Sequence, residues 1–258
     1  MRLMKRILSA AAVLALSASL LVGCSSGTAS SVPVSASSAA ESTVSSVEET
    51  ASSAVDENEA AAAQLLNDLT GSYQELWPVI LADEYKQTWL DDCTALVGEE
   101  NAEAAFEKLS SMVTSDVYGE DAVEAYANGG GAYFCGFTNS LATLTFDGET
   151  SIISGTDKDG NVLFSHTYHY IGMEPVHGLY EFESDDADSG EFTYFFLAPD
   201  TSAETYHIEF RYGSDAEALS QYDAGEYAYW VASGISTDCD QTMIDNCIEL
   251  FCTENLAG

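Results

Sequence analysis

The chain has 258 residues, 43 of them acidic and seven of them Lys or Arg. From Cys24 onward the same 43 acidic residues stand against four basic ones, which gives a formal charge of −39; the four are Lys86, Lys108, Lys158 and Arg211. A surface of this charge repels phosphate backbones, which excludes nucleic acid as a partner, whereas it attracts cations without selecting among them.

The chain begins with the pattern of an export signal. Three basic residues among the first six precede an apolar run over 7–21. Gly23 and Cys24 follow shortly after this run. This order of charge, apolar stretch and small-residue cleavage site is typical of a secretory signal. A simple membrane anchor is the alternative, but the run is short for a span of about 20 residues. We therefore expect a lipoprotein signal peptide over 1–23 and a lipid-anchored Cys24 on the extracytoplasmic face of the cell membrane.

The segment 24–60 predicts a disordered tether behind the lipidated cysteine. Nearly all of it is Ser, Ala, Thr, Val and Glu, with one proline and no aromatic residue. Such a composition buries too little apolar surface to offset its chain entropy. The remaining residues, 61–258, suit one domain with a sizeable core.

The first part of this domain predicts helices. The segment 60–69 is rich in Ala, Leu and Gln. Over 73–96 and 99–112, apolar residues recur mostly at intervals of three and four, which is the spacing of one helix face. Pro78 falls near the start of its segment, where helices tolerate it.

The pattern changes to strands after three consecutive glycines at 129–131. Short runs of β-branched and aromatic residues alternate there with turn signals. They predict strands near 132–138, 141–146, 150–154, 161–171, 178–183, 191–198 and 204–212, with turns at 147–148, 157–161, 185–190 and 199–203. A final helix is expected over 240–256. Short strands joined by hairpins favour an antiparallel barrel or sandwich, so the fold class is α+β.

Five cysteines follow the anchor, at positions that form no C-x-x-C pair: Cys93, Cys135, Cys239, Cys247 and Cys252. This spacing excludes a zinc ribbon or a thioredoxin-like motif. The odd number leaves at least one cysteine unpaired. Disulfides are permitted outside the cell, but the sequence does not give their pairing, and we interpret most of these residues as small core side chains.

Strand 204–212 is the segment with the most suggestive polar residues. His207, Glu209 and Arg211 alternate with apolar or aromatic residues, so the two sets point to opposite faces. The simpler interpretation is that the polar set faces solvent. The functional interpretation is a polar stripe at the mouth of a barrel, where an imidazole and a carboxylate bind zinc.

The other three histidines are His166, His169 and His177. His166 and His169 fall on opposite faces of one predicted strand and cannot chelate together from it, so a three-histidine site would need His207 and favourable loops. Two acidic turns, 157–161 and 186–191, alternate Asp with Gly. Neither has the twelve-residue length and closing Glu of an EF-hand, so we interpret both as hairpin turns.

No enzyme motif is present. The chain lacks G-x-S-x-G, H-E-x-x-H, the P-loop and the dinucleotide fingerprint, so we expect a protein that is not an enzyme.

Three segments resemble the ZinT (YodA) family of bacterial extracytoplasmic zinc-binding proteins. The segment 68–78 has that family's opening, with a Gly, an aromatic-Gln pair and an aromatic-Pro pair. The segments 178–183 and 195–213 are similar to its central hairpin and its metal-binding hairpin. Residues 227–230 and the last helix also fit, so the resemblance covers most of 65–255.

The resemblance implies a lipocalin-like (calycin) antiparallel β-barrel with N-terminal helices and a C-terminal helix. It also implies zinc held by three histidines of the metal-binding hairpin. His207 matches the last of them, whereas Phe195 and Thr205 stand at the other two positions and are not ligands. Substitute ligands could come from the same strand face or from neighbouring strands: Glu209, His166, His169 or His177.

The leading hypothesis is an extracytoplasmic lipoprotein that binds zinc or another divalent ion, for capture or for delivery to a metal-uptake system. The alternative is a lipocalin-like module that binds a small organic ligand or a partner protein and has lost the metal site. A purely structural envelope domain is a third possibility. A histidine cluster at ligand distance favours the first, and an apolar cavity with His207 hydrogen-bonded to Glu209 favours the second.

Overall fold

The computed structural model describes residues 57–198 and 207–256. The expected signal peptide, Cys24, most of the tether, the turn 199–203 and Thr205 lie outside the described residues. In the described part of the chain, no helix is long and apolar enough to cross a membrane.

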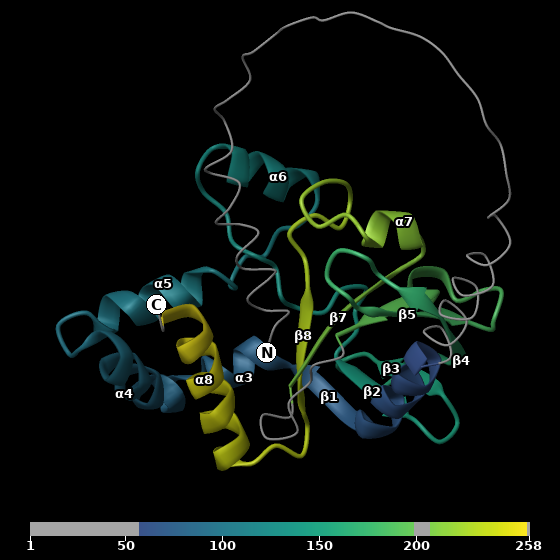
Figure 1. The fold of residues 1–258 in the computed structure, drawn as a ribbon, viewed down its shortest axis with the longest axis horizontal. Coiled ribbons are helices and arrows are strands. Elements are labelled where there is room, and N and C mark those ends of the chain that lie inside the picture. Colours follow the sequence, from purple (N-terminus) through teal and green to yellow (C-terminus); the bar gives the residue numbers. More distant parts are fainter. Residues whose placement is uncertain (1–56, 199–206, 257–258) are drawn as a thin grey trace, which may run out of the picture.

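Eight antiparallel strands close into one barrel, in which each strand pairs with its neighbours in the chain and the last pairs with the first (Figure 1). They are β1 (Gly71–Glu75), β2 (Thr143–Asp147), β3 (Ile152–Thr156), β4 (Val162–Met173), β5 (Tyr180–Ser184), β6 (Tyr194–Leu197), β7 (His207–Gly213) and β8 (Ala232–Ser236). The barrel and the α+β class expected from the sequence are confirmed.

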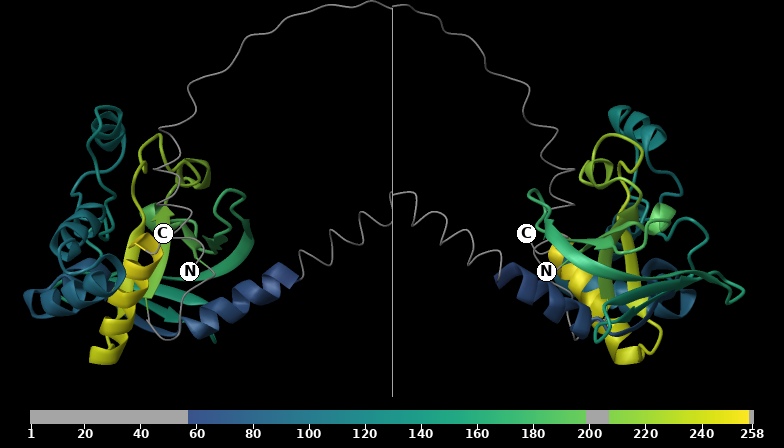
Figure 2. Two further views of the ribbon diagram at one scale, coloured as in Figure 1. Left: turned by 60° about the vertical axis from the view of Figure 1, so that its left-hand side comes forward. Right: turned by 90° about the vertical axis from the view of Figure 1, so that its right-hand side faces the viewer.

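Helices flank the barrel on two sides (Figures 1 and 2). They include α3 (Leu76–Ile80), α4 (Lys86–Val97), α5 (Ala102–Ser111), α6 (Glu120–Ala127), α7 (Ala216–Leu219) and α8 (Gln241–Leu256), with 3-10 turns η1 (Asp83–Tyr85) and η2 (Gly190–Phe192). A further helix over 57–68 lies across the barrel from α4 and α5. There Gly148 approaches it so closely that a Cβ would lie 2.4 Å from the Cα of Asn67.

Helices α3, α4, α5 and α8 pack against one another as a helical group beside the barrel. This group is held by contacts between aromatic rings and between thiols. Trp89 of α4 meets Phe251 of α8 edge-on, with 5.9 Å between ring centroids. The sulfur atoms of Cys93 and Cys252 lie 3.9 Å apart between the same helices. Every cysteine of the described residues is a free thiol, and four of the five are buried, which confirms that most of them are core side chains.

Two sequence predictions about the elements are wrong, and two strands were not predicted. The segment 73–96 is not one helix, because its first residues belong to β1 and are followed by α3, η1 and α4. The segment 132–138 is not a barrel strand, since Phe134 makes only isolated bridges with Thr114 and Trp230. Finally, β1 and β8 were not foreseen, because they are specified by pairing with each other across the barrel seam and not by local periodicity.

Aromatic side chains fill the interior of the barrel. Phe195 of β6 lies 5.4 Å from Tyr168 and 5.9 Å from Phe164, both on β4. Since β4 and β6 are not neighbours in the sheet, these rings meet inside the barrel. Phe195 also stacks with Phe210 and Tyr212 of β7, at 6.3 and 5.4 Å, so the inner face of β7 belongs to this stack.

Candidate functional site

The outer face of β7 is buried, so the interpretation that its polar residues face solvent is wrong. Exposure is 7% for His207, 8% for Glu209 and 0% for Arg211. Segments far from β7 in sequence cover this face: one is the stretch around Cys135, whose carbonyl accepts a hydrogen bond from the amide of Ser233 on β8. The face is therefore a buried polar layer between the barrel and its covering loops.

Arg211 binds the loop that follows α7. Its guanidinium donates to the carbonyl oxygens of Leu219 and Tyr227, and to that of Gln221 at 3.3 Å. The guanidinium carbon also lies 4.1 Å from the ring centroid of Tyr222. Burial lowers the pKa of Arg211, but a guanidinium stays protonated in proteins. Arg211 therefore holds this loop against β7 through hydrogen bonds.

The loop between β4 and β5 adds a carboxylate and an imidazole to the same layer. Glu174 accepts the backbone N–H groups of Val176 at 2.9 Å and His177 at 2.5 Å. Burial alone would raise the pKa of Glu174, but the His177 imidazole, whose Nδ1 atom lies 3.4 Å from Oε2, and both backbone amides lower it. The His177 ring packs against that of Tyr222 in a tilted arrangement, with 3.7 Å between centroids and 39° between planes, so His177 is held by contacts within this layer.

His207 and Glu209 are the pair whose chemistry fits a zinc ion best. Alternate residues of a strand share a face and lie about 7 Å apart along it. Burial raises the pKa of the neighbouring Cys135 thiol, and that of Cys247 to about 12, with the charge of Glu209 adding to both effects. Imidazole nitrogen and carboxylate oxygen are both zinc-ligand types, so His207 and Glu209 offer two of them on one strand face.

His166 and His169 occupy a different part of the barrel. The Nδ1 atom of His166 lies 2.8 Å from Asp186, and that of His169 lies 2.7 Å from Asp185. The two rings start from opposite faces of β4, as expected. In the residues that the structure describes, no group of three or more His, Cys, Asp or Glu side chains is close enough to hold one metal ion. The four histidines therefore do not gather into one metal site in the part of the chain that the structure describes.

Phe195 stands at one of the ligand positions implied by the resemblance. It is fully buried inside the barrel, where its phenyl ring fills core space. The turn at 157–161 closes through the Asp157 carboxylate, which accepts the amides of Asp159 and Asn161 at 2.9 Å each. These hydrogen bonds confirm that this segment is a hairpin turn.

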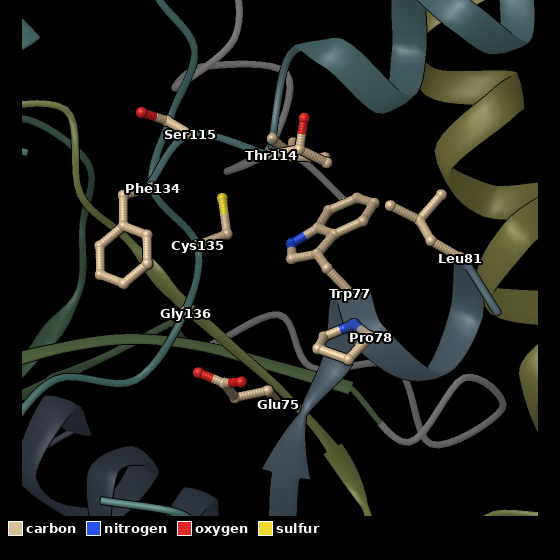
Figure 3. Close-up of a pocket in the computed structure, with 10 residues that line it drawn as sticks. Glu75, Trp77, Pro78, Leu81, Thr114, Ser115, Phe134, Cys135 and Gly136 are labelled. Atoms are coloured by element: carbon tan, nitrogen blue, oxygen red, sulfur yellow. The ribbon is translucent and has the colours of Figure 1, made fainter. Parts of the chain in front are cut away.

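A pocket of about 330 Å³ opens where the barrel meets the helical group (Figure 3). Its lining includes Glu75 at the end of β1, Trp77 of α3, and Phe134 and Cys135 from the segment before β2. This pocket was not predicted from the sequence, because residues 73–96 were interpreted as one helix. The run Glu75-Leu76-Trp77-Pro78, with a charge beside an aromatic residue, is the signal that could have drawn attention to it.

No family model and no curated protein matches the chain. Among solved structures, it is similar to the Zn(II)-bound ZinT-like domain of AdcA from Streptococcus pneumoniae, with 15% identity, a TM-score of 0.45, and 71% of this chain and 89% of that chain covered. It is also similar to Zn(II)-bound AdcA from the same organism, with 14% identity and a TM-score of 0.43. That likeness covers 72% of this chain and 35% of the other. At these identities and TM-scores, neither structure assigns a site or a ligand to this chain.

Proposed function

We propose that this protein is an extracytoplasmic lipoprotein that binds zinc or another divalent metal ion, for capture or for delivery to an uptake system. The metal is its cargo. The observation that carries the proposal is the pair His207 and Glu209, an imidazole and a carboxylate buried on one face of β7.

The spacing and burial of this pair support metal binding. Zinc takes imidazole nitrogen and carboxylate oxygen at about 2.0–2.2 Å, so two side chains about 7 Å apart at their Cα atoms can reach one ion. Zinc sites ordinarily have three or four protein ligands. Water completing the coordination of a two-ligand site would leave the ion exchangeable, which suits a cargo. The acidic surface also raises the local concentration of cations.

Zinc titration of the protein against a chromophoric chelator tests the proposal. We expect one zinc ion per chain with micromolar or tighter affinity, weakened at least about tenfold in His207→Gln and in Glu209→Gln, since each variant loses one ligand. The matched control is His169→Gln, because His169 is exposed and already paired with Asp185. If the three variants bind alike, or if salt abolishes binding, ordinary surface carboxylates hold the metal and the proposal fails.

The anchor is tested separately. Cys24→Ser should move the protein from the membrane fraction to the soluble fraction, because the lipid is attached to that sulfur. Retention of the variant on the membrane would contradict lipidation at Cys24.

A further inference from the structure

The pocket between the barrel and the helical group has rigid aromatic walls. Trp77 is held edge-on against Phe251 of α8, with 4.8 Å between ring centroids. On the opposite side Phe134 stacks on Tyr118 at 5.5 Å and 12° between planes. Figure 3 shows the Trp77 and Phe134 side chains on either side of Cys135, with Pro78 below Trp77.

A carboxylate lies between these walls without a balancing charge. Glu75 accepts one hydrogen bond, at 2.6 Å from the amide of Phe137 to its Oε1 atom. Among the described residues it has no ion-pair partner. A half-buried carboxylate that is not neutralised by the protein creates a strong preference for a positive charge in the space beside it.

The backbone at Gly136 is shaped to admit both groups. A Cβ atom at this position would lie 2.7 Å from the ring of Phe134 and 2.9 Å from Oε1 of Glu75. Glycine therefore lets the aromatic wall and the carboxylate approach the same segment, which makes the pocket a built feature and not a gap between loosely packed elements.

We propose that this pocket binds a small organic ammonium ion, with the cationic head at Glu75 and an apolar body between Trp77 and Phe134. A tryptophan face attracts ammonium groups, and the carboxylate adds a charge-assisted hydrogen bond. The volume of about 330 Å³ lies at the lower end of the range for small-molecule sites. The proposal does not depend on metal binding at His207 and Glu209, whose nearest shared element with this pocket is the Cys135 thiol.

Ligand-observed NMR titration of the full chain with phenethylammonium tests the proposal. We expect saturable binding with a Kd of about 1 mM or tighter, and a weakening of at least about tenfold in Glu75→Gln. The glutamine keeps a side-chain oxygen for the Phe137 amide, so the fold is preserved while the charge is removed. The shape-matched anion 3-phenylpropionate should not bind, because the carboxylate repels it.

Thr114→Phe fills the pocket from an exposed position on its rim and should abolish binding of phenethylammonium. The control variant Glu99→Gln removes an exposed carboxylate elsewhere and should leave the Kd unchanged. The absence of saturable binding in the unaltered chain overturns the proposal. So does equal affinity for the anion, or an affinity that Glu75→Gln and Glu99→Gln lower to the same extent.

Discussion

The two faces of β7 are both buried, but different parts of the molecule bury them. On the inner face, Phe210 and Tyr212 stack with Phe195 from the neighbouring strand. On the outer face, Glu209 and Arg211 are covered by loops and helices that supply backbone carbonyls and polar side chains. Burial of a strand residue therefore does not require an apolar side chain, provided that the covering segments satisfy its hydrogen bonds.

This comparison predicts that the inner face contributes most to stability per side chain. Phe210→Ala removes a fully buried ring that touches Phe137, Phe195 and Tyr212. We expect a loss of about 3–5 kcal/mol in the free energy of unfolding, measured by denaturant titration, because a cavity remains inside the closed barrel. Val162→Ala, at a position with 70% exposure, is the control and should stay within about 0.5 kcal/mol. A loss below about 1 kcal/mol for Phe210→Ala would show that the barrel collapses around the gap.

The outer face should depend on hydrogen-bond geometry more than on volume. Arg211→Met leaves the carbonyl groups of Leu219, Gln221 and Tyr227 without their donor, so we expect a loss of about 2–4 kcal/mol. Arg211→Lys keeps the charge but not the planar fork, and should recover only part of the loss. Denaturant titration gives the stability, and hydrogen exchange should show faster opening of residues 219–227. Equal stability of the methionine variant and the unaltered chain would show that the hydrogen bonds of Arg211 do not stabilise the contact between β7 and this loop.

The smallest expected effect is the pH dependence that Glu174 gives to the outer face. Its folded-state pKa is lowered from the ordinary value of 4.5. The stabilisation, about 1 kcal/mol, is therefore present above that value and lost as the pH falls through the folded pKa. The stability difference between the unaltered chain and Glu174→Gln, measured against pH, should shrink in that window.

Glu181 provides a control of opposite sign. Burial, and then the charge of Glu174, raise the pKa of Glu181. Its ionised form is therefore disfavoured in the folded state, and Glu181→Gln should be neutral or slightly stabilising at neutral pH, with a difference that disappears in acid. Parallel pH profiles for the two variants would contradict the assignment of the stabilisation to the hydrogen bonds of Glu174.

The barrel was predictable from its middle strands and not from its seam. The alternation of residues 161–171 and 204–212 indicated strands because side chains of a strand alternate between faces, and β4 and β7 lie there. In contrast, β8 has the sequence ASGIS, whose small residues show no apolar alternation. It becomes a strand because Gly234 and Ser236 pair with Glu75 and Tyr73 of β1, far away in the chain.

The sequence by itself determined the fold class, the helix α8 and the shared face of His207 and Glu209, because each depends on the spacing of neighbouring residues. Only the tertiary structure decided that this face is buried, that Arg211 binds the loop after α7, and that Glu75 meets Phe134 in a pocket. These features arise where segments distant in the chain pack against one another. Such contacts depend on the geometry of the whole closed barrel, which no local pattern of residues contains.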